Sequence, residues 1–308
     1  MSFALKPVLF GEVLYDCFPD GKQVLGGAPF NVAWHLQGFA VGPLVLSSVG
    51  SDPLGDHILD VMAQWGMLTD GVYRHPQLET GSVSITLQQA QPSYTIHHPR
   101  AYDEIPPSKL LPDSAYLCHG SLALRQAQSK QTLQQIRSAD TPLRVLMDVN
   151  LRAPWWDIST IQQQLMGVDE IKLNDEELTK LTGAPISKET AVLAPYLDRL
   201  REENHAEQAI LTMGSQGAML VDAEGMVFMP APQTTLVDTV GAGDGLTAVW
   251  MLGGLLGWPT ALRLQRAIDF AAAICTQQGA TCLNAGFYQA WLTRWQVNEL
   301  NLESVRKS

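Results

Sequence analysis

The chain has 308 residues, of which 46% are hydrophobic and 17% are charged, so it can bury a large core and is not expected to be disordered. Its formal net charge is −11, from 20 Lys and Arg against 31 Asp and Glu, and no run of basic residues is interleaved with aromatic ones. Composition therefore excludes nucleic acid as an expected partner.

The sequence shows no sign of export or membrane insertion. The N-terminal MSFALKPVLFGEVLYDCF lacks a charged region followed by a long apolar stretch and a cleavage site. The most apolar run, LTAVWMLGGLLGW at 246–258, is too short for a bilayer and is expected to form a buried helix. The four cysteines have no metal-binding spacing and are expected to be reduced thiols. We therefore expect a cytoplasmic protein with no membrane partner.

Short apolar runs alternate with longer amphipathic segments along most of the chain. This alternation is typical of strands joined by crossover helices, and it predicts an α/β fold with a mostly parallel sheet. The expected core strands lie at 7–13, 44–50, 115–120, 143–150, 170–174 and 208–214. The expected helices between them lie at 28–39, 54–66, 126–139, 160–168 and 189–204.

Two segments depart from this rhythm. Residues 80–98, TGSVSITLQQAQPSYTIHH, alternate in steps of two around a polar turn, which predicts an antiparallel hairpin. Residues 12–27 form a second hairpin-like piece around the turn PDGK. We expect the two to pair into a small sheet that stands off the main one as a lid over a cleft. With no repeat or linker, 1–308 is expected to be one domain, and the unpaired lid edges favour a homodimer.

The stretch TTLVDTVGAGDGLTAVW at 234–250 concentrates glycine and aspartate at the start of an expected helix. It matches neither GxxxxGK[ST] nor GxGxxG. Small residues remove bulk where the first helical N–H groups are unpaired and the helix dipole is positive, so an anion could bind at Gly241, Ala242 and Gly243. Asp244 could then accept a proton from an attacking hydroxyl. The alternative is that Asp244 complements the helix dipole and Asp238 caps a turn.

Four motifs occur in a fixed order along the chain. They are the paired glycines, asparagine and G-x-D-x-x-G element of 26–56, KLNDEEL at 172–178, TMGSQGAML at 212–220 and DTVGAGDGLTAV at 238–249. Together these segments resemble the signatures of the ribokinase-like (PfkB) family of carbohydrate kinases. GEVLYD, GGAPFN and DVNLRAPWW at 148–156 look most like the fructokinase-type members. One departure is Val249, where the family usually has a small residue.

The resemblance implies a ribokinase-like three-layer sandwich with a mostly parallel central sheet and a small protruding β-lid. It also implies transfer of the γ-phosphoryl group of ATP to a sugar hydroxyl, with fructose as the expected sugar. Alternatives are 2-keto-3-deoxygluconate, ribose or a nucleoside, and a catalytically silent sugar or nucleotide sensor. A nucleoside would need stacking aromatics, for which Phe30 and Tyr102 are candidates. A sugar acid would need a cation such as Arg152 or Arg100.

The resemblance also implies roles for individual residues. Asp244 would be the general base, and the N–H groups of residues 241–243 would form the anion hole. Asn174 and Glu177 would lie near Mg²⁺, through water, although the same spacing also describes a helix capping box. Asp238 and the segment around Gly279 are candidates for a monovalent cation such as K⁺.

The remaining expected contacts divide between the sugar and the nucleotide. The expected sugar-binding residues are Asp16, Gly27, Asn31, Asn150 and Arg152. The nucleotide is expected along Thr212, Gly214 and Gly217, and at Gly241 and Gly243. Asn150 and Arg152 follow an expected strand at the point where open α/β sheets place their ligands. The glycine-containing segment from 212 could equally be a plain strand-to-hairpin turn.

Overall fold

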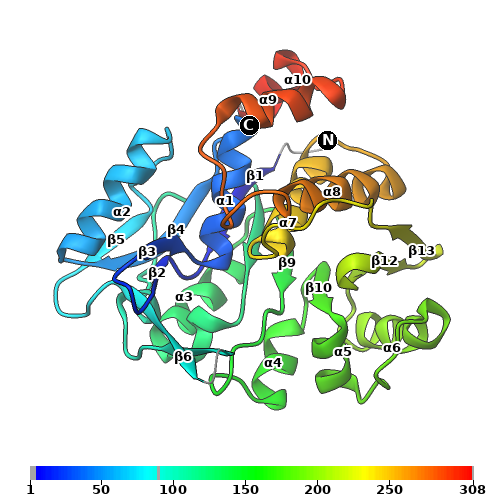
Figure 1. The fold of residues 1–308 in the computed structure, drawn as a ribbon, viewed down its shortest axis with the longest axis horizontal. Coiled ribbons are helices and arrows are strands. Elements are labelled where there is room, and N and C mark those ends of the chain that lie inside the picture. Colours follow the sequence, from blue (N-terminus) through cyan, green and yellow to red (C-terminus); the bar gives the residue numbers. More distant parts are fainter. Residues whose placement is uncertain (1–4, 89–90, 307–308) are drawn as a thin grey trace.

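The structure is a computed structural model that describes residues 5–88 and 91–306. Its strands form a nine-stranded sheet and a separate four-stranded sheet, and helices cover the large sheet (Figure 1). The same arrangement of a mostly parallel sheet between helical layers is the one expected from the sequence. The four-stranded sheet lies at the side of the molecule, next to the first helix.

The large sheet is parallel except at one edge. In spatial order its strands are β13 (Gly225–Pro230), β12 (Gly217–Asp222), β11 (Gln208–Thr212), β10 (Glu170–Asn174), β9 (Leu143–Asp148), β8 (Ala115–His119), β1 (Lys6–Phe10), β4 (Leu44–Gly50) and β5 (Val72–His75). The pairs β11–β12 and β12–β13 are antiparallel. The six strands expected from the sequence are confirmed, and the sequence analysis missed the other three strands at the two edges of the sheet.

The helices pack on both faces of this sheet. They are α1 (Ala28–Gly38), α2 (Pro53–Gln64), α3 (Ala127–Arg137), α4 (Ile158–Leu165), α5 (Asp175–Thr182), α6 (Thr190–Glu203), α7 (Ala242–Leu255), α8 (Thr260–Ile274), α9 (Ala285–Arg294) and α10 (Glu299–Arg306). Alternate residues of each strand enter different cores, so that Leu9 packs with the residues of α1, α7 and α8, whereas Phe10 packs with those of α3 to α6. Val249 is fully buried in α7, so the larger side chain is absorbed by the core.

The small sheet joins the two hairpins expected from the sequence. Its order is β3 (Gln23–Gly26), β2 (Leu14–Cys17), β6 (Gly81–Gln88) and β7 (Gln91–Ile96). Each hairpin is antiparallel, and β2 pairs with β6 in parallel. The expected turn between β6 and β7 lies outside the described residues. Because β3 leads directly into α1, the lid and the helical layer meet at residues 26–28.

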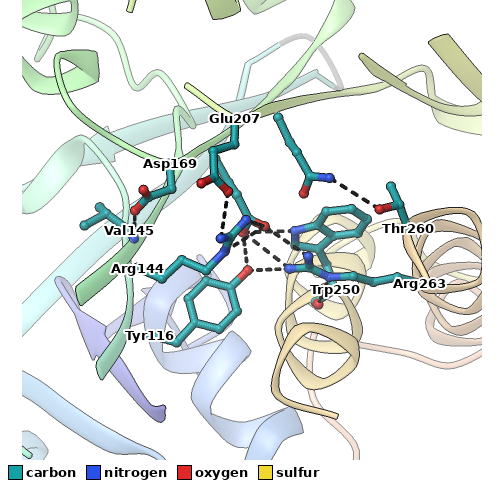
Figure 2. A network of polar contacts seen from close by, with 10 residues as sticks. Tyr116, Arg144, Val145, Asp169, Glu207, Trp250, Thr260 and Arg263 are labelled. Carbon is teal, nitrogen blue, oxygen red and sulfur yellow. Dashed lines mark hydrogen bonds and ion pairs between the residues drawn. The ribbon is translucent and has the colours of Figure 1, made fainter. Parts of the chain in front are cut away.

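A buried polar network stands at the amino ends of the central strands (Figure 2). Glu170 at the start of β10 is fully buried and accepts hydrogen bonds from Arg144, from the Trp250 indole at 3.1 Å and from the Tyr116 hydroxyl. Arg263 of α8 forms an ion pair with it at 3.0 Å. We call these five residues the amino-edge cluster. It fastens α7 and α8 to the sheet at the end opposite the expected site.

Two further expectations concern the cysteines and the membrane. All four cysteines are free thiols, as expected, and two of them, Cys118 and Cys282, are buried. Among the described residues, no helix combines the length and the apolar character that crossing a bilayer requires.

Candidate active site at the carboxyl edge of the sheet

The glycine-rich segment forms the start of α7, as expected. Gly241 is the N-cap with φ +80°, and a Cβ there would lie 2.5 Å from the Cα of Ala280, so conformation and packing both require glycine. The helix has no side-chain cap. The Ala242 N–H donates to the Thr239 carbonyl at 3.3 Å, whereas the N–H groups of Gly241 and Gly243 have no acceptor in the part of the chain that is described. Two of the three expected anion-hole donors are thus available to a ligand.

Asp244 lies in the first turn of α7 and is half-buried. Its Oδ2 accepts a hydrogen bond from Asn31 Nδ2 of α1 at 2.7 Å. Burial raises the pKa of Asp244 from 3.8 to about 6, although the Lys172 ammonium and the Asn31 hydrogen bond act to lower it. A carboxyl group with this pKa is mostly ionised at neutral pH and can still accept a proton, as a general base must.

The lid and α1 bring the expected sugar-binding residues together. A Cβ built on Gly26 would lie 3.9 Å from Asn31 Oδ1 and 4.0 Å from Asp16 Oδ2, so these two acceptors face the same small space. Asn31 Oδ1 is buried and has no hydrogen-bond partner among the described residues. At Gly27, φ is +115° and a Cβ would collide with the Glu12 carbonyl. The space beside Gly26 is therefore lined by acceptors that a polyol could satisfy.

The loop after β9 contributes the other two expected sugar contacts. Asn150 has φ +43° and its carbonyl accepts a hydrogen bond from Ser121 Oγ at 3.3 Å. Arg152 is exposed, and its guanidinium donates to the carbonyl of Leu151 at 3.1 Å. Its positive charge lowers the pKa of Asp16 and of Asp244, although burial outweighs it in both, so Arg152 lies near the two carboxylates.

The sequence analysis missed three buried charges at this edge. Lys172 of β10 forms an ion pair with Asp148 of β9 at 2.6 Å, and Glu12 follows β1. Burial raises the pKa of Glu12 to about 7, and its Oε2 has no hydrogen-bond partner in the part of the chain that the structure describes. The signal for Lys172 was present, because a lysine inside the apolar strand EIKLN is seldom buried without a partner. We define the carboxyl-edge cluster as Glu12, Asn31, Asp148, Arg152, Lys172 and Asp244.

The expected magnesium residues adopt the capping-box arrangement that the sequence left open. Asn174 Oδ1 accepts the Glu177 N–H at 2.8 Å, and Glu177 Oε2 accepts the Asn174 N–H at 2.9 Å. The other carboxylate oxygen accepts the N–H of Leu151 at 2.8 Å. Burial raises the pKa of Glu177. No group of three or more His, Cys, Asp or Glu residues is arranged to hold a metal within 5–88 and 91–306.

The expected nucleotide residues lie beside this capping box. Thr212 is paired with Asn174 in the β10–β11 register, so the two residues are adjacent at the carboxyl edge. Gly214 has φ +57° within a short 3₁₀ turn, and a Cβ on Gly217 would collide with the Met229 carbonyl of β13. The turn and the hairpin thus account for both glycines by themselves. Any contact with a nucleotide remains a prediction.

Asp238 ties two segments together behind the anion hole. Its carboxylate accepts the N–H of Val240 and the N–H of Gly279, each at 3.0 Å. These bonds fix the segment that Gly241 packs against. The structure thus gives Asp238 a scaffolding role, and its binding of a monovalent cation remains a prediction.

The two aromatic candidates for stacking on a nucleobase are ruled out. Phe30 and Tyr102 are both fully buried in the hydrophobic cores, so neither presents a ring face to a ligand. The expectation that they stack on a nucleobase was wrong because the fold surrounds both rings with apolar side chains that are distant in the sequence. Arg100 is one of the two cations considered for a sugar acid. It forms an ion pair with Glu79 at 3.3 Å and donates a hydrogen bond to the carbonyl of Pro99. Arg152 is the remaining candidate of that pair.

Comparison with known proteins gives consistent matches. The sequence matches the pfkB family carbohydrate kinase domain over residues 12–285. A Pyrococcus horikoshii protein described as a sugar kinase is 26% identical, with 87% of this chain and 89% of that protein covered. Fructokinase of Salmonella typhimurium is 27% identical, covering 94% and 98%. The structure of Vibrio cholerae fructokinase with fructose, ADP and calcium superposes with a TM-score of 0.78 at 21% identity, covering 94% and 99%.

Proposed function

Because this chain belongs to the pfkB family of carbohydrate kinases, we propose that it transfers the γ-phosphoryl group of ATP to a hydroxyl of fructose. The observation that carries the proposal is the position of Asp244, beside free N–H groups at the start of α7 and hydrogen-bonded to Asn31 at 2.7 Å. A base and an anion site within one helical turn suit the attack of a hydroxyl on a phosphoryl group.

In the proposed reaction, Asp244 takes the proton from the attacking hydroxyl. The hydroxyl oxygen bonds to the γ-phosphorus, the bond from this phosphorus to the bridging oxygen breaks, and its electron pair leaves with ADP. The N–H groups of Gly241 and Gly243 donate to the phosphoryl oxygens as charge develops on them. Asn31 and Asp16 orient the sugar by accepting hydrogen bonds from its hydroxyls, since both have acceptor atoms facing the same space.

Mg²⁺ fits the capping box of α5 through water. The side-chain oxygens of Glu177 and Asn174 already accept hydrogen bonds from backbone N–H groups. Each oxygen therefore has one lone pair left for a water bound to Mg²⁺, and the two residues do not form a complete set of direct ligands. Mg²⁺ retains several waters and takes phosphate oxygens as ligands, which such a site allows. When bound with ATP, the ion would offset the negative charge of the phosphates. We place K⁺ near Asp238, and the phosphates or ribose of ATP along Thr212, Gly214 and Gly217, on the family resemblance.

Charge favours a neutral sugar over a sugar acid. Four carboxylates and two cations lie at the proposed sugar site. The carboxylates are those of Glu12, Asp16, Asp148 and Asp244, and the cations are Arg152 and Lys172. A substrate carboxylate would add a fifth negative charge beside them. A nucleoside is disfavoured because the two expected stacking rings are in the core. Fructose also agrees with the Vibrio cholerae structure, whose description includes fructose and ADP.

The test is ADP release from MgATP with fructose, ribose, 2-keto-3-deoxygluconate, glucose and adenosine, using Asp244→Asn as the blank. We expect a single strong response, with fructose, that disappears in the variant. A strong response to another compound would replace fructose as the substrate. Saturable binding of ATP and sugar with no ADP release from any of them would reject the kinase and support the sensor.

A homodimer through the lid is part of the proposal. The strands β3 and β7 are the outer strands of the small sheet, and Tyr94 on β7 is 62% exposed. Unpaired strand edges can add a second sheet. Light scattering at micromolar concentration should give twice the mass of the chain, and the mass of a monomer would rule out the proposed homodimer.

A further inference from the structure

The most unusual charge at the carboxyl edge is Lys172. Its side chain is 8% exposed, and it projects from the middle of β10 into the space beneath α7. Burying an ammonium costs several kcal/mol unless it is paired, and Asp148 provides that pairing at 2.6 Å. The Asp148 carboxylate also accepts a hydrogen bond from Thr247 Oγ1 at 3.3 Å, one turn after Asp244. The ammonium is therefore anchored to both β9 and α7.

The position of the ammonium relative to the first turn of α7 gives it a second use. A Cβ built on Gly243 would lie 3.2 Å from Lys172 Nζ, so the charge stands directly beneath the glycine backbone. Thr247 Oγ1 also lies 3.0 Å from the Gly243 carbonyl, so its single hydroxyl proton is shared between this carbonyl and Asp148 and keeps the turn close to β9. A fixed cation under the turn that carries Asp244 favours the ionised form of that carboxylate.

The charges around Asp244 come from several elements. Those that act on it or face it are Glu12 after β1, Cys118 of β8, Asp148 of β9, Arg152 after β9 and Lys172 of β10. Lys172 is the strongest of the groups that favour the ionised form of Asp244, and Asp148 and Glu12 oppose it. An ATP phosphate beside α7 would add further negative charge. Keeping the base ionised during turnover therefore requires a fixed positive charge.

We propose that Lys172 is a positioning residue for phosphoryl transfer, which, anchored by Asp148 and Thr247, holds the Asp244 carboxylate ionised while a phosphate lies beside it. This inference rests on the proposed function for its activity readout. Lys172 touches neither the sugar nor the phosphate in this role. It acts only through Asp244, so removing Lys172 should lower activity only in the pH range in which Asp244 titrates.

The test compares Lys172→Met and Lys172→Gln with the wild-type chain. Glutamine keeps a donor for Asp148 without the charge, so it remains informative if the methionine variant fails to fold. We expect the acidic limb of kcat/KM for fructose to move up by about one pH unit, which is about fivefold lower activity at pH 6 and little change at pH 8.5. Lys180→Met, an exposed lysine of α5, is the control and should not move the limb.

A second readout does not depend on turnover. Carbon-13 NMR of labelled aspartate, with Asp244→Asn for assignment, should show a higher Asp244 pKa in both variants. An unchanged pKa, or an equal loss of activity at all pH values, would overturn the role of Lys172. Failure of the wild-type chain to phosphorylate any sugar would reject the proposed function alone, and the NMR titration would still decide whether Lys172 holds Asp244 ionised.

Discussion

The two ends of the same central strands carry buried ionic clusters of opposite character. At the amino edge, Glu170 is surrounded by Arg144, Arg263, Tyr116 and Trp250, and both of its oxygens are used (Figure 2). Burial raises the pKa of Glu170, but the two guanidinium groups outweigh it, so the pKa is lowered. Among the described residues, no polar atom of this cluster is buried without a partner.

The carboxyl-edge cluster is left incomplete. Glu12 Oε2 and Asn31 Oδ1 are buried without partners, and burial raises the pKa values of Glu12 and Asp244 toward neutrality. An unpaired buried acceptor costs about 1–3 kcal/mol, so it persists where a ligand supplies the missing donor. The two clusters thus differ in hydrogen-bond saturation, since the amino-edge cluster is complete and the carboxyl-edge cluster keeps two buried acceptors for a ligand.

The first prediction tests the structural end of the comparison. Glu170→Gln leaves the buried Arg263 guanidinium without its counter-charge, whereas the half-buried Arg144 keeps its ion pair with Glu207, so it should lower the free energy of unfolding by about 3 kcal/mol. Urea unfolding followed by fluorescence measures this loss. The activity of the folded fraction should stay within about twofold of wild type, because sites that are far apart change each other's energetics by only about 0.3–0.5 kcal/mol. A stable variant with a large loss of kcat would reverse the roles assigned to the two edges.

The second prediction tests the incomplete end. Asn31→Ala removes both the hydrogen bond to Asp244 and the unpaired acceptor, and it should lower kcat/KM for fructose by about 10². The matched control is Asn204→Ala, another buried asparagine, whose side chain bonds only the carbonyl of Leu200. The control should lose stability with unchanged kinetics. Equal kinetic losses in the two variants would mean that Asn31 has no special place in the site.

The third prediction concerns stability and pH. The pKa of Asp244 is higher in the folded chain than its ordinary 3.8, so the folded state binds this proton more tightly. Its contribution to stability is full below about pH 4 and is lost as the pH rises through about 6. Relative to Asp244→Asn, the wild-type chain should thus lose about 2 kcal/mol of stability from pH 4 to 7. Asp60→Asn, on the exposed side of α2, is the surface control.

The fourth prediction separates the substrate classes. Arg152→Ala removes the exposed cation beside Asp16 and Asp244, and it should lower kcat/KM for fructose by about tenfold, since a lost interaction of about 1.4 kcal/mol has that effect. Activity on 2-keto-3-deoxygluconate should change little in absolute terms, because we expect it to be low. A loss that is far larger for the acid than for fructose would show that Arg152 binds a substrate carboxylate.

Much of the fold could be predicted because each central strand is a short apolar run bounded by polar turns. Two of the three missed strands lack this signal, since β5 is only four residues long and half of it is exposed, and β13 alternates at an open edge. The third, β12, is a buried apolar run that carries the signal and was overlooked. Helices α8 to α10 were not predicted, although α8 has the same amphipathic pattern as the helices that were. The lid was predictable from its two-residue alternation and its PDGK turn.

The site was predictable where the chain concentrates unusual residues, as at Gly241–Asp244. It was not predictable where chemistry depends on residues brought together by the sheet, because Lys172 and Asp148 are neighbours only through strand pairing. The burial of individual side chains was the other property that could not be predicted from the sequence. Phe30 and Tyr102 look available in the sequence and are fully enclosed in the structure, whereas Asn174 and Glu177 satisfy each other as a local pattern allows.

The most direct test of the two-edge account measures kcat/KM for fructose in Asp244→Asn and Glu170→Gln side by side, each corrected for its folded fraction. Both substitutions replace a carboxylate by an amide of the same shape, at a half-buried position in Asp244 and a fully buried one in Glu170. The account predicts a loss of about 10³ or more for Asp244→Asn, as expected for a missing general base, and near-wild-type activity for Glu170→Gln. Substantial activity in Asp244→Asn would contradict the account, because the chemistry would not then depend on the carboxyl edge.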